Sequence, residues 1–147
     1  MANRKHMLAI LMAAAVMLPG VSIARGKTCS ERDAIAADAM VDHLDSWGKV
    51  DLASSRYGHC DDGEIAEGYS EAVARLLVDH WYMLPQLDAL TKRNRSLRPF
   101  VLRHINTTLD THDLNRIRDL STVSCPAGMN TLCEAMRDAA SHSLNSH

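Results

Sequence analysis

The sequence predicts an all-α fold, a small single-domain bundle of about six short helices cross-linked by two disulfides. Apolar residues recur at intervals of three and four through most of the chain, which is the period of a helix with one buried face. No segment alternates between polar and apolar residues as a strand does, and no Asn-Gly dipeptide joins two apolar runs. The four cysteines are an even number, as expected of an exported chain whose thiols are paired.

The first 24 residues have the three parts of a secretory signal peptide. Residues 4–6 are basic, residues 7–18 are uniformly apolar, and small residues precede an expected cleavage after Ala24. The apolar run is too short for a membrane span. We therefore expect residues 25–147 to form one periplasmic or secreted domain, with no stable membrane anchor after cleavage.

Capping residues and glycines divide the first half of this domain into helices. Ser30 can cap a first helix whose apolar face continues to Trp47, and Gly48 is placed to end it. Residues 49–59 form a shorter and less regular stretch. The strongest pattern follows over residues 65–84, with opposite charges four residues apart on its polar face.

The second half predicts four shorter helices and a loose end. Pro85 suits the first turn of one helix, Ser96 can cap another, and Asp110 or Thr111 opens the next. The last helix follows a Pro-Ala-Gly turn, and the tail 141–147 is expected to fray. Apolar residues place these helices over residues 85–90, 96–105, 110–120 and 129–140.

The cysteines stand at the ends of these predicted helices. Cys29 and Cys60 each directly precede a strong helix, and the chain between them is long enough to return to its start, which favours pairing the two. Cys125 and Cys133 bracket the Pro-Ala-Gly turn, and we pair them as well. Four cysteines allow three pairings, so this connectivity is a hypothesis.

Residues 58–65, Gly-His-Cys-Asp-Asp-Gly-Glu-Ile, gather more reactive groups than any other stretch. In a structural interpretation Cys60 is oxidised, Asp61 and Asp62 cap the next helix, and Glu64 lies in its first turn. The spacing matches neither a calcium loop nor a zinc motif, so no metal site is predicted. An alternative interpretation makes Glu64 or Glu67 the general acid of a small cell-wall glycoside hydrolase.

No other motif assembles a catalytic or cofactor site. Residues 68–72, Gly-Tyr-Ser-Glu-Ala, lack the second glycine of the G-x-S-x-G elbow and lie within a predicted helix, so Ser70 is expected to be a solvated helix residue. The histidines share no face with metal-ligand spacing, and neither a haem motif nor a phosphate loop occurs. We therefore predict no catalytic residue, metal or cofactor.

The charge is unevenly distributed along the domain. Cleavage after Ala24 leaves 14 basic and 18 acidic residues, a net charge of −4, which does not favour binding to nucleic acid. Residues 25–88 have 6 basic and 13 acidic residues, whereas residues 92–118 have 7 basic and 2 acidic. This basic segment either pairs with the acidic half, stays solvated, or binds an acidic partner protein or an anionic ligand through its arginines. The partner-binding candidates are Arg93, Arg95, Arg98 and Arg103.

Three short motifs resemble a group of small exported bacterial helical proteins that have no assigned function. They are Cys-Asp-Asp-Gly-Glu-Ile-Ala-Glu-Gly at 60–68, Val-Leu-Arg-His-Ile at 101–105 and Cys-Pro-Ala-Gly at 125–128. The resemblance implies no activity. The general plan is also similar to periplasmic immunity proteins that neutralise cell-wall-degrading toxins. We therefore expect an exported, non-enzymatic interaction protein, such as an inhibitor or immunity-type partner of another envelope protein.

Overall fold

The computed structural model describes residues 26–146, so the predicted signal peptide lies outside the described residues. This part of the chain is a single all-α domain without strands, which confirms the predicted fold class. Two short 3₁₀ turns, Gly58–Cys60 and Trp81–Met83, supplement the α-helices. The α-helices are α1 (Glu31–Val41), α2 (Trp47–Tyr57), α3 (Gly63–Val78), α4 (Leu84–Arg93), α5 (Leu97–Arg103), α6 (Thr111–Val123) and α7 (Asn130–Leu144).

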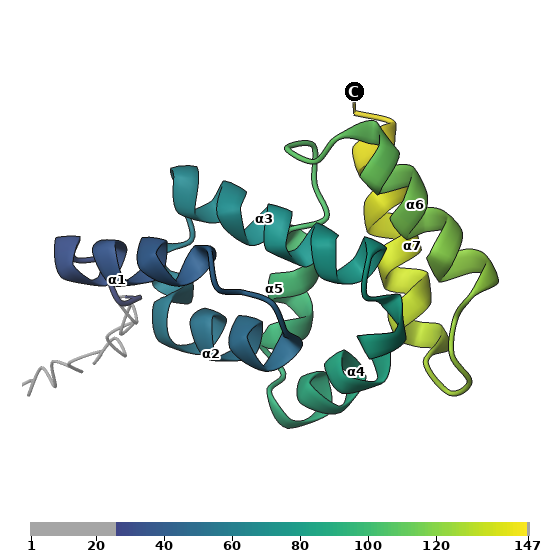
Figure 1. The fold of residues 1–147 in the computed structure, drawn as a ribbon, viewed down its shortest axis with the longest axis horizontal. Helices are drawn as coiled ribbons and strands as arrows, with labels where there is room; N and C mark the ends of the chain where they lie inside the picture. The colour runs from purple at the N-terminus through teal and green to yellow at the C-terminus, as the bar shows by residue number, and fades with distance from the viewer. Residues whose placement is uncertain (1–25, 147) are drawn as a thin grey trace, which may run out of the picture.

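Helix α3 lies at the centre of the arrangement (Figure 1). It packs against α1 near one end and against α6 near the other, while α2 contacts α4 and α5. Helices α6 and α7 lie side by side as a helical hairpin on the opposite side from α1. One continuous apolar core joins helices α2 to α7. Helix α1 packs against it through the partly buried Met40 and Val41.

The first predicted helix is wrong in its length. It was expected to reach Trp47 and stop at Gly48, but α1 ends at Val41 and Trp47 begins α2. The chain turns at Ser46, whose backbone is extended with a φ of −152°. This turn lets both Leu44 and Trp47 face the core, where each is at most 1% exposed. The helical spacing of apolar residues therefore continues from α1 to α2, although the helix itself is interrupted between them.

Other sequence signals correspond to observed helix ends. Ser30 caps α1 by accepting a hydrogen bond from the Asp33 N–H, and Asp110 caps α6 by accepting one from the Asp113 N–H. Pro85 lies in the first turn of α4, as predicted. The tail differs from the prediction, because α7 continues to Leu144. Its buried Ser143 donates a 3.0 Å hydrogen bond to the carbonyl of Ile105.

Both favoured disulfides are present, and no described cysteine is free. Cys29–Cys60 ties the segment before α1 to the segment before α3, with the two Cα atoms 4.9 Å apart. Cys125–Cys133 ties the α6–α7 turn to the first turns of α7. The predicted connectivity is confirmed.

Helices α1 and α3 approach closely at Gly68. A Cβ atom at this glycine would lie 2.3 Å from Val41 Cγ1 and 3.3 Å from Val41 Cβ. We expect Gly68→Ala to lower the free energy of unfolding by about 1–3 kcal/mol, because overpacking outweighs the gain in helix propensity. Urea denaturation measures the change.

Gly48→Ala is the matched control for this substitution. Gly48 is exposed in the first turn of α2, and a Cβ atom there would have no neighbour within 4 Å. Alanine is expected to stabilise the protein there by up to about 1 kcal/mol. A Gly68→Ala variant as stable as Gly48→Ala would contradict the close approach of α1 and α3.

Candidate functional site

The stretch 58–65 is a junction that connects three helices. Cys60 forms the disulfide to the start of α1, and His59 Nε2 lies 2.9 Å from Asp33 Oδ2 on α1. Asp62 is the N-cap of α3 and accepts a 2.8 Å hydrogen bond from the Gly63 N–H. Gly63 has a φ of +53°, a conformation that favours glycine and turns the chain into α3. The structural interpretation therefore fits Cys60 and Asp62.

Asp61 does not cap α3. The sequence interpretation, which made both Asp61 and Asp62 cap residues, was therefore wrong for Asp61. Its side chain is 5% exposed and faces the C-terminal end of α5. Arg103 Nε donates a 3.0 Å hydrogen bond to Asp61 Oδ2, and Nη2 of the same guanidinium donates to the same oxygen. The other oxygen, Oδ1, lies 3.3 Å from His104 Nε2, just beyond the usual hydrogen-bond length. Each oxygen of the carboxylate thus has a different cationic or polar neighbour.

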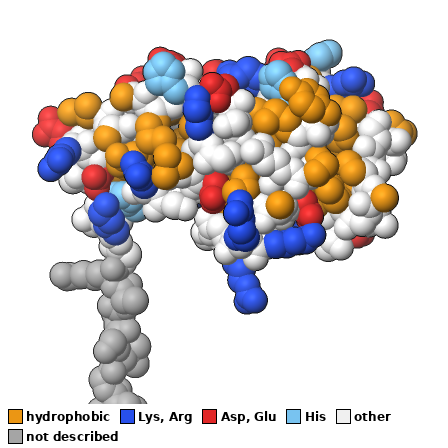
Figure 2. All heavy atoms as spheres, turned by 60° about the horizontal axis from the view of Figure 1, so that its bottom comes forward, with side chains coloured by type: hydrophobic (Ala, Val, Ile, Leu, Met, Phe, Trp, Pro, Cys, Tyr) orange, Lys and Arg blue, Asp and Glu red, His pale blue; other side chains and the backbone are white. Residues whose placement is uncertain are grey.

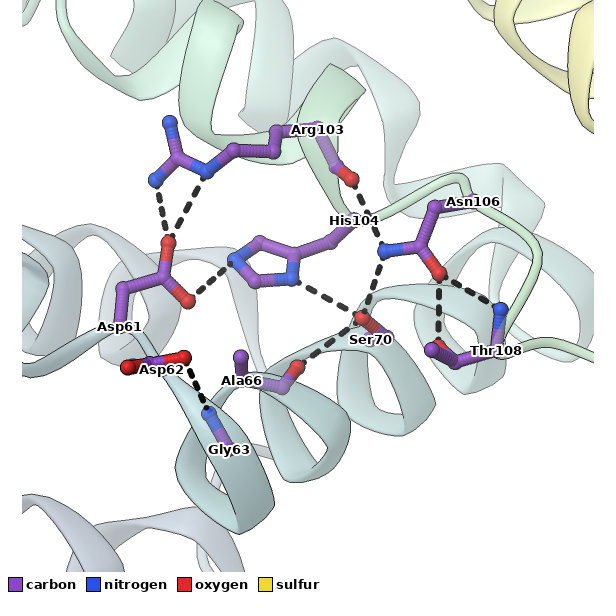
Figure 3. A network of polar contacts seen from close by, with 9 residues as sticks. All are labelled: Asp61, Asp62, Gly63, Ala66, Ser70, Arg103, His104, Asn106 and Thr108. Atoms are coloured by element: carbon purple, nitrogen blue, oxygen red, sulfur yellow. Dashed lines mark hydrogen bonds and ion pairs between the residues drawn. The ribbon is translucent and has the colours of Figure 1, made fainter.

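His104 joins Asp61 to Ser70 on α3 (Figure 3). Its imidazole is 2% exposed, and its Nδ1 lies 3.0 Å from Ser70 Oγ. Ser70 Oγ is also 3.0 Å from the carbonyl of Ala66, one turn earlier in α3. Asn106 Nδ2 donates a 3.2 Å hydrogen bond to Ser70 Oγ. We call Asp61, His104, Ser70 and Asn106 the polar cluster.

Aromatic side chains support the imidazole from the core side. Phe100 and Tyr69 each pack edge-to-face with His104, with ring centroids 4.5 and 5.6 Å away. The Arg103 guanidinium lies over the Phe100 ring, 5.3 Å from its centroid. The polar cluster is therefore a fixed group of side chains with an apolar wall.

Ionised Asp61 is the dominant charge inside this cluster. Burial raises the pKa of the Asp61 carboxyl, but the nearby His104 and the hydrogen bonds from Arg103 outweigh it, so the pKa lies below its ordinary value. Burial, with a further contribution from the Asp61 charge, raises the pKa of Tyr69 to about 12. At neutral pH Asp61 is therefore a carboxylate and Tyr69 a neutral phenol.

A pocket of about 260 Å³ opens onto the polar cluster. All four cluster residues line it, together with the more exposed Glu67, Arg103 and Thr108. Asn106 shapes the rim, because its Oδ1 accepts hydrogen bonds from the N–H and the hydroxyl of Thr108 at 2.8 and 2.7 Å. The cluster thus has a route to solvent.

No family model, curated protein or solved structure gives a significant match to this chain. Among residues 26–146, none of the helices combines the length and apolar character that a bilayer crossing requires.

The expectation that Ser70 is solvated is wrong, because Ser70 is 1% exposed. A signal was present in the sequence: Ala66, Val73 and Leu77 lie four residues before and three and seven after Ser70, on one helical face. Nothing in the sequence places His104 beside it, since the two are separated by 34 residues along the chain.

The four candidate arginines occupy different environments. Arg103 is held by Asp61, and Arg98 is partly buried, with Nη2 donating a 2.9 Å hydrogen bond to the Thr131 carbonyl on α7. Arg93 and Arg95 are exposed, and neither has an ion-pair or hydrogen-bond partner within residues 26–146. The structure therefore keeps two of the four free of internal partners.

A fixed turn presents these two arginines. Asn94, which separates them, donates hydrogen bonds to Asp51 Oδ1 at 2.6 Å and to Ser55 Oγ at 3.2 Å, both on α2. Its side-chain oxygen accepts hydrogen bonds from the Ser96 N–H and hydroxyl at 3.1 and 2.6 Å. The turn between α4 and α5 is thus anchored from both sides.

Basic side chains gather around this turn. Figure 2, which brings the α4 side of the molecule forward, shows Lys and Arg side chains projecting from its lower part. A cleft of about 290 Å³ lies alongside and is lined by Lys92, Arg98 and the loop before α7. Lys92 is paired with Asp88 one turn earlier in α4. We call Arg93, Arg95 and Arg98 the basic turn.

The two candidate glutamates of the hydrolase interpretation line different pockets. Glu64 borders a surface hollow of about 370 Å³ between α1 and α3, with Ile35 and two aspartates. Glu67 borders the pocket of the polar cluster. The nearest carboxylate in that pocket, Asp61, is held ionised by Arg103, and no tryptophan, tyrosine or phenylalanine lines either space.

A group of possible metal ligands occurs elsewhere, at the start of α6. Asp110, His112 and Asp113 bring one ligand atom each within 4.8 Å of one another. Asp110 already accepts the Asp113 N–H as the helix cap, and the group is mostly exposed. Its geometry is accounted for by helix capping.

Proposed function

We propose that this protein is an exported interaction protein that binds an acidic region of another envelope protein through the basic turn, as an inhibitor or immunity-type partner would. The observation that carries the proposal is the pair of exposed arginines, Arg93 and Arg95, on a turn fixed by Asn94. Two disulfides support a periplasmic or secreted location, because disulfides persist in oxidising compartments.

The basic turn is preorganised for binding a partner. An arginine without an internal partner has its full set of N–H donors available for carboxylates of a partner. Because the turn is already held to α2, binding orders only the arginine side chains and leaves the backbone unchanged. The local excess of positive charge also accelerates encounter with an acidic surface.

The glycoside hydrolase alternative has less support. Sugar-binding sites need stacking aromatic faces and two carboxylates across one bond, whereas Glu64 and Glu67 border separate spaces without such aromatic residues. A peptidoglycan-release assay tests this alternative, with Glu67→Gln as the inactive variant. Release by the wild-type protein that this substitution abolishes would replace the interaction proposal.

The interaction proposal is tested by reversing the charge of the basic turn. The oxidised protein, immobilised through a C-terminal tag, is used to isolate a stoichiometric partner from an envelope extract, and the dissociation constant is then measured with purified components. We expect Arg93→Glu/Arg95→Glu to weaken binding by about 10- to 100-fold or more, with a steep salt dependence in the wild type.

Arg32→Glu/Arg116→Glu is the matched control. Both arginines are exposed, lie on α1 and α6, and change the net charge by the same amount. We expect this control to bind within about threefold of the wild type, because the charges lie away from the basic turn. Equal weakening by both double variants, or an envelope extract that yields no stoichiometric partner, would overturn the proposal.

A further inference from the structure

We propose that Ser70, His104 and Asp61 form a nucleophilic site for acyl transfer, with a small ester as the class of substrate. The site is independent of the basic turn. It rests on the chain of contacts from Ser70 Oγ to His104 Nδ1 at 3.0 Å and from His104 Nε2 to Asp61 Oδ1 at 3.3 Å. A serine, a base and an orienting carboxylate in this order are the arrangement that activates a hydroxyl for attack on a carbonyl.

The charge of Asp61 determines which imidazole nitrogen carries the hydrogen. An ionised carboxylate only accepts hydrogen bonds, and Arg103 keeps Asp61 ionised by donating to its other oxygen. The Asp61 carboxylate, 3.3 Å from Nε2 without full hydrogen-bond geometry, favours the tautomer that carries its hydrogen on Nε2. This tautomer leaves the lone pair of Nδ1 directed at Ser70 Oγ, which is the position of a general base.

The serine hydroxyl has a choice of acceptors. Its single hydrogen can be donated to the Ala66 carbonyl or to His104 Nδ1, and both lie 3.0 Å away. Rotation about one side-chain bond therefore exchanges a purely structural hydrogen bond for the reactive one. Asn106 Nδ2 donates one hydrogen to Ser70 Oγ and the other to the Arg103 carbonyl at 3.0 Å, so it fixes the position of the hydroxyl oxygen in either state.

The pocket restricts the substrate. Its volume of about 260 Å³ is just below the usual size of ligand sites, which selects a small acyl group. Ser70 lines the pocket but is only 1% exposed, so the acyl carbon must pass the more exposed Asn106 and Thr108. Arg103 is already paired with Asp61, so the exposed Glu67 leaves the pocket lining with a net negative charge, which disfavours anionic substrates.

The reaction conserves atoms and charge with water as the second reactant. Ser70 Oγ bonds to the carbonyl carbon while its proton passes to His104 Nδ1, which leaves the negative charge on the former carbonyl oxygen. The intermediate then expels the alkoxide, which leaves as an alcohol with the proton from His104. Water repeats the sequence on the acyl-serine, releasing a carboxylic acid and restoring the hydroxyl.

An alkyl fluorophosphonate tests the site directly, because it forms a serine–phosphorus bond and releases fluoride only at an activated hydroxyl. The oxidised protein is treated folded and after unfolding in urea, reduced, digested with trypsin and analysed by mass spectrometry. The fragment between Arg56 and Arg75 contains Ser70 as its sole serine. We expect one adduct per molecule on Ser70 in the folded protein and none after unfolding.

Two variants separate an activated serine from an accessible one. His104→Gln keeps a side chain of similar size but removes the base, and we expect the labelling rate to fall by about 10²–10⁴-fold. Ser143→Ala removes another buried serine that donates to a carbonyl, and labelling should match the wild type. Circular dichroism verifies that both variants are folded.

Three outcomes would overturn the proposal. The first is that no adduct forms while a known serine hydrolase in the same tube is fully labelled. The second is an adduct on Tyr69 or elsewhere instead of on Ser70. The third is that the folded His104→Gln variant is labelled at the wild-type rate. The Arg93→Glu/Arg95→Glu variant should label normally, so failure of this proposal and failure of the interaction proposal are distinguishable.

Discussion

Replacing Cys29 and Cys60 together by alanine is expected to lower the free energy of unfolding by about 3–4 kcal/mol. The bond joins positions 31 residues apart, and its loss restores to the unfolded chain the conformational entropy of that whole loop. A domain of this size is stable by only about 5–15 kcal/mol, so a large share of its stability depends on one bond. Urea denaturation at neutral pH measures the loss.

The second disulfide provides the matched control. Cys125 and Cys133 are 8 residues apart, so Cys125→Ala/Cys133→Ala is expected to cost about 2–3 kcal/mol by the same entropic argument. Each pair includes one buried cysteine, Cys60 or Cys133, so the loss of packing is similar. A larger loss from the short loop than from the long one would contradict the entropic explanation.

Asp61→Asn is expected to destabilise the protein by about 2–3 kcal/mol near neutral pH. The substitution preserves the shape of the side chain but removes the charge that pairs with Arg103 and faces His104. The cost stays below that of a fully buried ion pair, because the Arg103 side chain is 57% exposed and returns partly to water. Urea denaturation of both proteins across a pH series gives the difference.

This difference should disappear in acid. The folded-state pKa of Asp61 lies below the ordinary value of 3.8, so its charge contributes stability above that value. The contribution is lost as the pH falls through the folded pKa, where the wild type becomes protonated and resembles the variant. Asp33 and Asp45, whose pKa values are also lowered by hydrogen bonds from His59 and Lys49, respectively, remain in both proteins and cancel.

The neighbouring Asp62→Ala variant is the control for position. Asp62 is exposed and makes a single cap hydrogen bond to Gly63, so its loss should cost only about 0.5–1 kcal/mol. Equal destabilisation by both substitutions, or a difference that persists unchanged in acid, would contradict the assignment of Asp61 to the polar cluster.

The fold class could be predicted from the sequence because it depends on local pattern, and the disulfides because each cysteine lies beside a predicted helix end. Helix caps such as Ser30 and Asp110, and a first-turn proline such as Pro85, act within one turn of the backbone. Their effect is therefore visible in a few neighbouring residues, as is the helical spacing of apolar residues. The division between α1 and α2 could not be predicted from spacing, because Leu44 and Trp47 keep a helical interval across an extended Ser46.

The polar cluster could not be predicted because its contacts are long-range. Asp61 is adjacent to a true cap residue and has the same chemistry, so local rules assign it the same role. Its actual partners, Arg103 and His104, are brought near by the packing of α5 against the core. A single sequence contains no signal for that proximity.

The position of Cys60 directly before Asp61 has a consequence for the order of events in the cell. While the thiols are reduced, the segment carrying Asp61 lacks its covalent link to the start of α1. We therefore expect Asp61 to settle against Arg103 and His104 late in maturation, after oxidation has closed the loop. In a chain retained in a reducing compartment, the contacts of Asp61 with Arg103 and His104 would then not form stably, although the whole chain had been synthesised.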